Sequence, residues 1–525
     1  MGEATSEVKK SYARRFARGS TIVFTTLIVS SVIGLILRIF LARTLTVADY
    51  GLFYAVFALV SLFGLFREPG IGQAIVKYIP EFVVKKRLDL IKSSITVLML
   101  FQVLFSLSIS LILIAFSDQM AITIFGTAEA SLVIKILSGW FLFVAIFYTF
   151  KTPFQGFQEM VPHSLLGFLE IVLPLIFAFF FIGIFGPSPA NFAFAYLAGL
   201  AITSLIAFGL FLKKHSDVLS AKMRISKPLL KKLFAFALPA FIGGFGALII
   251  GYMDTLMITM FRSLPEVGFY QVAKPAASLL HYFPMAISIV LFPMISELWA
   301  RREQKLVGQA MHIIIKFSFI FIIPAALILI AFPDVVITLL FGSEYLAASI
   351  ALQILTFTAV VYTLSAISGS MLAGIGKPAI VTMAVGITAC FNFVLNLILI
   401  PPYGIEGAAI ATFLSMLVGL SISLHFARRF VRFTIPSSSL LKALGGGLLA
   451  LLMIFGLKLI IDLPPIFELP IPEFFVVMTP SLIFYAAWIL RTKTLTWGDL
   501  LLLKNAMPIP KWLLRVARKF IKPKG

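Results

Sequence analysis

About fourteen long apolar stretches divide this chain of 525 residues, each close to the roughly 20 residues that a helix needs to cross a bilayer. We expect spanning helices near residues 20–42, 51–67, 92–116, 132–150, 163–184, 190–212, 233–261, 274–297, 312–332, 349–372, 379–401, 405–427, 439–461 and 472–491. Hydrophobic residues make up 60% of the chain and charged residues 12%. Because a soluble fold must cover itself with polar groups, the sequence predicts an all-α polytopic membrane protein.

The charged residues between these stretches predict an orientation. If the N-terminus lies inside, the inner segments hold 35 of the 43 Lys and Arg when Lys92, Lys442 and Arg491 at the ends of spans are included, whereas the outer loops hold only Arg43 and Arg262. Cytoplasmic loops carry such an excess of Lys and Arg, so we expect a multi-pass protein of the cell membrane with both termini cytoplasmic. The basic stretch 511–522 is amphipathic and is expected to lie on the inner membrane surface, with a solvated tail as the alternative.

The sequence lacks the motifs of several other classes of protein. Its single cysteine, Cys390, excludes a disulfide framework and a CxxC site, and no HExxH or clustered carboxylates suggest a metal. No GxxxxGK[ST] motif occurs, so we expect neither a cofactor nor ATP hydrolysis by this chain. The net charge of +21 comes from short basic clusters between apolar runs, which indicates membrane loops rather than nucleic-acid binding.

Two halves of the chain resemble each other at an almost constant offset. Asp49–Phe53 (DYGLF) matches Glu266–Tyr270 (EVGFY) at an offset of 217, and Pro162 matches Pro378 at 216. The copies fall in equivalent predicted contexts, which predicts two six-helix lobes in a parallel repeat and two extra C-terminal helices. The expected parts are an N-terminal lobe (1–212), a basic cytoplasmic linker (213–232), a C-terminal lobe (233–430), two further helices (431–491) and a basic cytoplasmic tail (492–525).

Two charged residues inside predicted spans are the first site candidates. Arg38 ends a small, polar stripe of the first span, and Asp254, at an offset of 216, ends a similar stripe of the seventh. Each costs about 2.5–3.5 kcal/mol on insertion scales, so each needs a partner or a wet cavity. Arg38 either faces a cavity, where guanidinium suits a phosphate, or snorkels to the interface or pairs with Asp254. Asp254 is a candidate for binding a coupling proton or sodium ion.

Four more polar residues are candidates for the same functions. Arg67, Lys274 and Asn392 are candidates for lining a substrate cavity, and Glu170 is a second candidate for ion coupling. For Arg67, Lys274 and Glu170 the alternative is pairing with a neighbouring group. Asn392 lies four residues from Asn396 on one helix face, where hydrogen bonding between helices is the alternative.

Over about residues 15–490, the chain resembles the polysaccharide flippases of the multidrug/oligosaccharidyl-lipid/polysaccharide exporter superfamily. The stretches that carry the resemblance are Asn396–Thr412 (NLILIPPYGIEGAAIAT), Ala48–Leu52, Glu266–Tyr270, Phe292–Glu297 and Leu340–Tyr345. The resemblance implies a V-shaped fold of two lobes with a central cavity. It also implies that an undecaprenyl- or dolichyl-diphosphate-linked oligosaccharide moves from the cytoplasmic to the outer leaflet, with glycosyltransferases of the same pathway as possible partners.

The resemblance further implies that basic cavity residues meet the diphosphate, a role that we carry over to Arg38 first and to Arg67 and Lys274 second. The multidrug branch has an acidic residue in its first helix, and Arg38 stands there instead, which argues against cation extrusion. Flippases of the peptidoglycan precursor have several cavity arginines, which makes that substrate less expected here. The alternatives are a cation-coupled multidrug antiporter and, more remotely, a membrane polysaccharide polymerase or ligase. The outer loops are short and without histidine, so we expect a transporter and no enzyme.

Overall fold

The computed structural model describes residue 23 and residues 25–67, 70–461 and 471–496, and across these ranges the regular structure is helical. Contacts within the chain divide it into two compact units. Unit 1 comprises Met1–Gln271 and Val385–Ala408, and unit 2 comprises Val272–Ala384 and Ala409–Gly525. These units follow packing, whereas the lobes expected at 1–212 and 233–430 follow the internal repeat, so the lobe boundaries stay a prediction.

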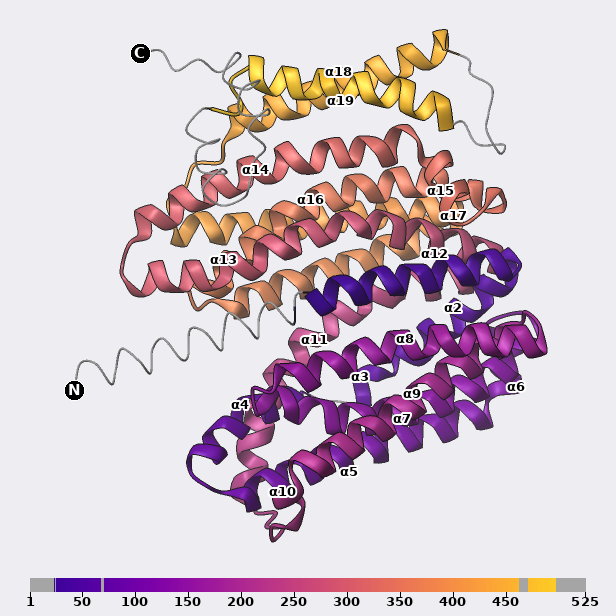
Figure 1. The fold of residues 1–525 in the computed structure, drawn as a ribbon, viewed down its shortest axis with the longest axis vertical. Helices are drawn as coiled ribbons and strands as arrows, with labels where there is room; N and C mark the ends of the chain where they lie inside the picture. The colour runs from indigo at the N-terminus through magenta and orange to yellow at the C-terminus, as the bar shows by residue number, and fades with distance from the viewer. Residues whose placement is uncertain (1–22, 24, 68–69, 462–470, 497–525) are drawn as a thin grey trace. The chain divides into compact units, whose positions relative to one another are not determined.

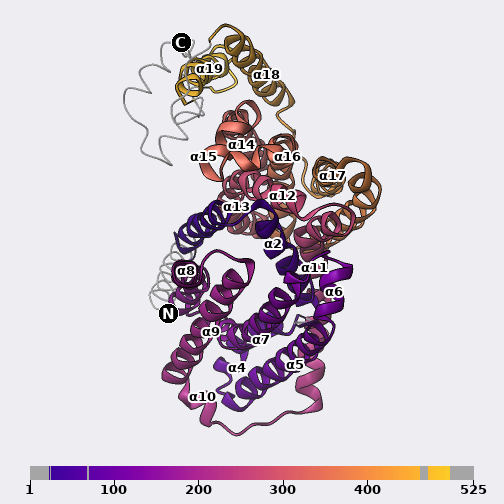
Figure 2. The same cartoon turned by 90° about the vertical axis from the view of Figure 1, so that its right-hand side faces the viewer.

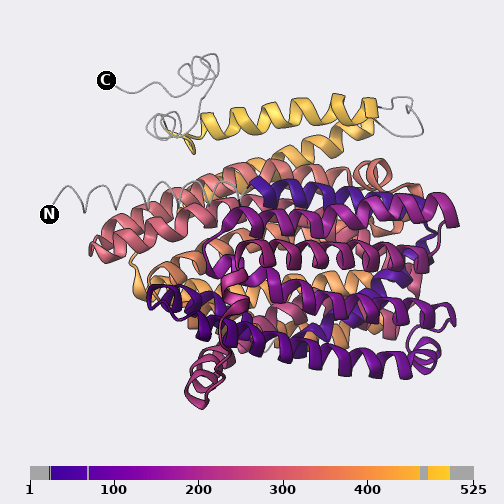
Figure 3. The same cartoon turned by 60° about the horizontal axis from the view of Figure 1, so that its bottom comes forward.

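Unit 1 contains long helices joined by short connections (Figure 1). Its helices are Thr25–Thr44, α2 (Val47–Leu62), α3 (Gly64–Arg67), α4 (Ile71–Val84), α5 (Leu88–Ala115), α6 (Ser117–Thr123), α7 (Glu129–Gly156), α8 (Met160–Phe185), α9 (Pro189–Lys214), α10 (Ser216–Ser220) and α11 (Lys227–Phe261). The first part of α12 (Leu264–Ser278) and the middle of α17 (Pro378–Phe430) complete the unit. Within it α9 packs against both α7 and α8 (Figure 1), and Figure 3 shows the helices from another side.

Unit 2 begins within α12 and includes both ends of α17. Its other helices are η1 (Leu279–His281), α13 (Tyr282–Ala300), α14 (Gln304–Ala331), α15 (Pro333–Leu340), η2 (Ser343–Ala348), α16 (Ser349–Gly374), α18 (Ser437–Ile460) and α19 (Ile471–Arg491). In this unit α16 packs against α13 and α14 (Figure 2), and α18 lies beside α19.

The described residues include 12 helices that are long and apolar enough to cross a membrane. The class of fold is therefore confirmed, but the expected count of fourteen spans is not. Two differences explain this. Pro378–Phe430, of 53 residues, covers two predicted spans and is counted once although its backbone is kinked at Gly404. Val47–Leu62, at 16 residues, is too short to be counted. The predicted amphipathic stretch 511–522 lies outside the described residues.

Side-chain caps explain where several helices begin. The Thr46 hydroxyl accepts a hydrogen bond from the backbone N–H of Asp49 at 3.2 Å and starts α2. Ser188 caps α9 in the same way through Asn191, and Ser226 caps α11 through Leu229. Each cap satisfies one of the backbone donors that the first turn of a helix leaves open, which matters most beside lipid.

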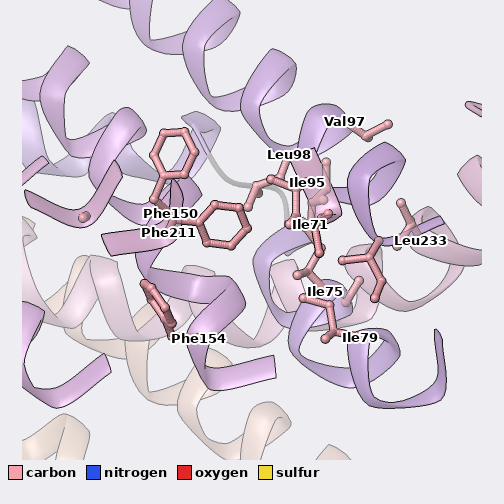
Figure 4. Packing of buried hydrophobic residues seen from close by; sticks show 14 of the residues in the cluster. Ile71, Ile75, Ile79, Ile95, Val97, Leu98, Phe150, Phe154, Phe211 and Leu233 are labelled. Atoms are coloured by element: carbon pink, nitrogen blue, oxygen red, sulfur yellow. The ribbon is translucent and has the colours of Figure 1, made fainter. Parts of the chain in front are cut away.

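The core of unit 1 lies among α4, α5, α7, α9 and α11, as Figure 4 shows. Ile71, Ile75 and Ile79 are buried at a spacing of four residues, so they line one face of α4. Phe150 and Phe154 do the same for α7. The packing fixes α4, which follows Arg67 in the sequence, and α7, which contains Lys151.

The repeated motif has a structural reason in its glycines. A Cβ atom on Gly51 of α2 would lie 2.0 Å from the backbone oxygen of Leu264, and one on Gly268 of α12 would lie 2.4 Å from that of Val47. The two copies of the motif therefore face each other across a contact of backbone against backbone. Only glycine permits this approach, which explains why both copies contain it.

Candidate functional site

Arg38 lies in the Thr25–Thr44 helix, where its neighbours Leu37 and Leu41 are buried. Its guanidinium carbon is 4.5 Å from the centre of the Tyr54 ring, and its Nη1 donates a hydrogen bond of 3.2 Å to Oε1 of Gln271. A cation over an aromatic face gains about 0.5–2 kcal/mol, so these contacts offset part of the cost of placing the charge inside a span. Pairing of Arg38 with Asp254, the alternative that the sequence left open, stays a prediction, and the contact that holds the guanidinium here is the one with Gln271.

Asp254 lies on α11 with no exposed surface, and two neutral donors hold its carboxylate. The Tyr270 hydroxyl donates to Oδ2 at 2.8 Å, and Nδ2 of Asn396 donates to Oδ1 at 2.8 Å. The same Nδ2 atom lies 3.1 Å from Oδ1 of Asn392, and both asparagines are buried. Asn396 thus makes the expected hydrogen bond between helices, from α17 to α11, whereas its contact with Asn392 lies within α17.

This buried cluster also contains an unsatisfied hydrogen-bond acceptor. Oδ1 of Asn396 has no hydrogen-bond partner among the described residues. Carboxylate and amide oxygens are the ligands that hard cations prefer. The cluster can therefore accept a proton on Asp254 or a small cation on its oxygens.

A second polar cluster joins α7 and α8. Nζ of Lys151 donates to Oε2 of Glu170 at 2.8 Å, and the Tyr148 hydroxyl donates to Oε1 at 3.0 Å. The Arg67 guanidinium carbon is 5.2 Å from the centre of the Tyr148 ring. Two predicted site residues, Arg67 and Glu170, thus meet around Tyr148 and Lys151, neither of which the sequence had indicated as a site residue.

The remaining candidate, Lys274, is a half-buried residue of α12 that belongs to unit 2. The other five, Arg38, Arg67, Glu170, Asp254 and Asn392, belong to unit 1. Sequence reasoning missed Gln271, Tyr270 and Tyr54, because a neutral polar residue inside an apolar stretch is not unusual. Tyr270 and its neighbour Gln271 do stand at the end of the repeated motif, which could have drawn attention to them.

A cavity in unit 2 is separate from these clusters. It has a volume of about 680 Å³ and is lined by Ser421, Leu424, His425, Arg428, Arg429 and Ile435. None of the six predicted site residues lines it, so it does not coincide with the predicted site.

Comparisons with known proteins agree on one group of transporters. A family model described as polysaccharide biosynthesis protein matches residues 16–299, and one described as MatE matches residues 239–398. An uncharacterized membrane protein of Methanocaldococcus jannaschii is 30% identical over 464 residues, 86% of this chain and 92% of that protein. The probable low-salt glycan biosynthesis flippase Agl15 of Haloferax volcanii is 27% identical over 54% of this chain and 58% of its own. The lipid II flippase MurJ of Bacillus subtilis is 25% identical over 55% of this chain and 58% of its own.

Solved structures show the same fold at low sequence identity. A structure of the lipid II flippase MurJ in an inward closed conformation has a TM-score of 0.72 and 17% identity, and the match covers 91% of this chain and all of that one. An inward-facing multidrug resistance MATE family transporter of the MOP superfamily has a TM-score of 0.65 and 16% identity, with 76% of this chain and 94% of that one covered.

Proposed function

Because this chain belongs to the polysaccharide biosynthesis protein family of MOP-superfamily flippases, we propose that it moves a lipid-linked oligosaccharide or polysaccharide repeat unit from the cytoplasmic to the outer leaflet. It is a multi-pass membrane transporter, as its apolar helices and its relatives agree. The observation that carries the proposed substrate is Arg38, a cation held inside a spanning helix by Tyr54 and Gln271.

The physical problem of such a transporter is the saccharide headgroup. Each polar group that enters hydrocarbon without a partner costs several kcal/mol, so the protein must replace the water that the headgroup loses. A guanidinium group can bind a phosphate through two parallel hydrogen bonds. We assign the first diphosphate contact to Arg38, and further contacts to Arg67 and Lys274, while two repeat-related lobes alternate in access.

The cluster around Asp254 supports a coupling site for a proton or a sodium ion. Its carboxylate is buried, and Oδ1 of Asn396 is an acceptor without a partner among the described residues. In this proposal Asn392, first considered for substrate binding, serves the ion site, because its side chain contacts Asn396. Glu170 is the second choice, since Lys151 and Tyr148 already bind both of its oxygens.

The relatives support a lipid-linked glycan as the class of substrate. The names of two of them specify a flippase of glycan biosynthesis and a flippase of lipid II. A saccharide that glycosyltransferases of the same pathway assemble on a polyprenyl- or dolichyl-diphosphate carrier fits the cations of this chain. The second candidate function is a cation-coupled multidrug antiporter, which the match of the MatE model over residues 239–398 favours and the position of Arg38 disfavours.

A reconstitution assay tests the proposal. The purified chain is placed in vesicles that hold a fluorescent, diphosphate-linked oligosaccharide lipid, and a sugar-cleaving enzyme outside measures which leaflet the lipid occupies. We expect transfer by the wild type and by Arg43→Ala, whose exposed arginine stands five positions further along the same helix. We expect Arg38→Ala to transfer at least about tenfold more slowly, the loss of one charge-assisted contact.

Two results would change the assignment. Equal transfer by Arg38→Ala and the wild type would remove Arg38 from the substrate site and leave the flippase function in place. If the lipid stayed in its leaflet while a cationic dye was extruded along an imposed ion gradient, the antiporter function would replace the proposal.

A further inference from the structure

Two neighbouring hydrogen bonds join α11 to α12 in the interior of unit 1. The Tyr270 hydroxyl donates to Asp254 at 2.8 Å, and Nε2 of Gln271 donates to Oγ1 of Thr255 at 2.7 Å. The four residues form two adjacent pairs, and each of them is at most 8% exposed. A movement of α12 along α11 that breaks one of these bonds therefore also acts on the other.

The side chain of Gln271 has a partner at each end. Its Oε1 accepts from Arg38 at 3.2 Å, while its Nε2 donates to Thr255. Guanidinium groups only donate hydrogen bonds, so the amide oxygen must face Arg38 and the amide nitrogen must face Thr255. The backbone oxygen of Gln271 accepts a further bond of 3.3 Å from the buried Tyr50 hydroxyl, which holds this residue in place.

We propose that Gln271 and Thr255 are positioning residues that couple the state of Asp254 to the availability of Arg38. This inference rests on the proposed function, in which Arg38 binds a diphosphate and Asp254 binds a proton or a sodium ion. A cation at Asp254 neutralises the acceptor of the Tyr270 hydroxyl and loosens that bond. The adjacent bond between Gln271 and Thr255 then shifts, and Arg38 loses its acceptor and turns to the diphosphate.

This coupling must be reciprocal. If a cation at Asp254 raises the affinity of Arg38 for a diphosphate, then the diphosphate raises the affinity of Asp254 for the cation by the same factor. Asp254 and Arg38 need not touch, because the Tyr270–Asp254 and Gln271–Thr255 hydrogen bonds and the side-chain amide of Gln271 connect them.

Binding of farnesyl diphosphate to the purified full-length chain in detergent tests the coupling. The dissociation constant is measured by calorimetry with sodium or choline as the cation, and at pH 6 and pH 8. We expect one of the two cations, sodium or the proton, to change it at least about fivefold in the wild type. In Gln271→Leu and Thr255→Val the probe still binds, but the change falls below about twofold, whereas Thr255→Ser keeps it because the hydroxyl remains.

Matched controls separate coupling from folding. Gln102 is another fully buried glutamine of unit 1, which accepts from the Thr149 hydroxyl at 3.1 Å, so Gln102→Leu removes a comparable bond elsewhere. It should leave the ion dependence unchanged. Arg38→Ala should lose the probe under every condition, and Asp254→Asn should bind it without ion dependence.

The outcomes distinguish the inference from the function on which it rests. If the wild type bound no diphosphate probe, the proposed function and the coupling would both be overturned. If the wild type bound it with an ion dependence that Gln271→Leu and Thr255→Val retained, only the coupling through these residues would fail. Binding without any ion dependence in the wild type would overturn the coupling as well.

Discussion

Lys151 and Glu170 form an ion pair between two membrane-spanning helices, with side chains 11% and 27% exposed. Removing one partner from a buried pair leaves an uncompensated charge, which costs more than the pair contributes when both partners are present. Ionisable residues in apolar stretches can be recognised from sequence, and Glu170 was found in this way. Its partner could not be recognised, because Lys151 lies at the edge of a predicted span and its contact with α8 depends on the packing of two helices.

A pair of variants tests this account at the level of single residues. We expect Lys151→Met to destabilise the protein by about 3 kcal/mol, because Glu170 keeps its charge and loses the cation that binds its Oε2 atom. The double variant Lys151→Met/Glu170→Gln should recover at least half of that loss. Thermal unfolding in detergent measures both, and equal losses in the single and double variants would show that the charge itself is not the cause.

Helix α4 is joined to the start of α11 by a polar contact outside the candidate spans. Nζ of Lys232 donates to both carboxylate oxygens of Glu81, at 2.8 and 2.7 Å, and Lys85 donates at 2.6 Å. These hydrogen bonds, first from Lys232 and then from Lys85, lower the pKa of Glu81 from its ordinary value of 4.5 to about 2. The sequence predicted a span over 233–261 from its apolar run, but not this contact between distant parts of the chain.

The lowered pKa of Glu81 gives a pH dependence with a definite sign. The stabilisation is complete above the ordinary pKa and is lost as the pH falls from about 4.5 to about 2, because the folded state resists protonation. We therefore expect Glu81→Gln to unfold at a lower temperature than the wild type at pH 7 and at a similar one near pH 2. A constant difference across this range would contradict the assignment.

The contact between α2 and α12 depends on the glycines of the repeated motif. We expect Gly51→Ala and Gly268→Ala each to cost about 1–3 kcal/mol, because a new methyl group would lie within 2.4 Å of a backbone oxygen. Gly183→Ala in α8 is the control, since a Cβ there would meet nothing within 4 Å. The sequence indicated that these glycines correspond. The structure supplies the reason, which is a contact between two helices and cannot be recognised from either helix alone.

At the scale of the whole molecule, the sequence predicted the class of fold and the family, because both depend on long runs and repeated motifs. The number of spans is not confirmed where two predicted spans are counted as one helix. The backbone of α17 leaves the helical region at Gly404, with φ of 57° and ψ of −131°, next to Pro401 and Pro402. The sequence placed the boundary between two spans there, and the helical segments on either side of this kink are counted together as one.

The orientation of the chain is a prediction that labelling can test. In a Cys390→Ser background, we expect Asp217→Cys to react with a membrane-impermeant maleimide only in opened cells, and Glu129→Cys to react in intact cells as well. Both positions are exposed, so a difference between them reports their side of the membrane rather than burial. The reverse pattern would invert the topology and with it the proposed direction of transport.

The backbone contact between Gly51 and Gly268 also has a consequence for the speed of rearrangement. Interfaces built from long side chains must select matching rotamers each time they form, and each immobilised side chain costs up to about 2 kcal/mol of entropy. Two glycine surfaces have no rotamers to select. Helices that meet in this way can separate and rejoin in the same register many times, which suits a protein that must return to its starting state after every cycle.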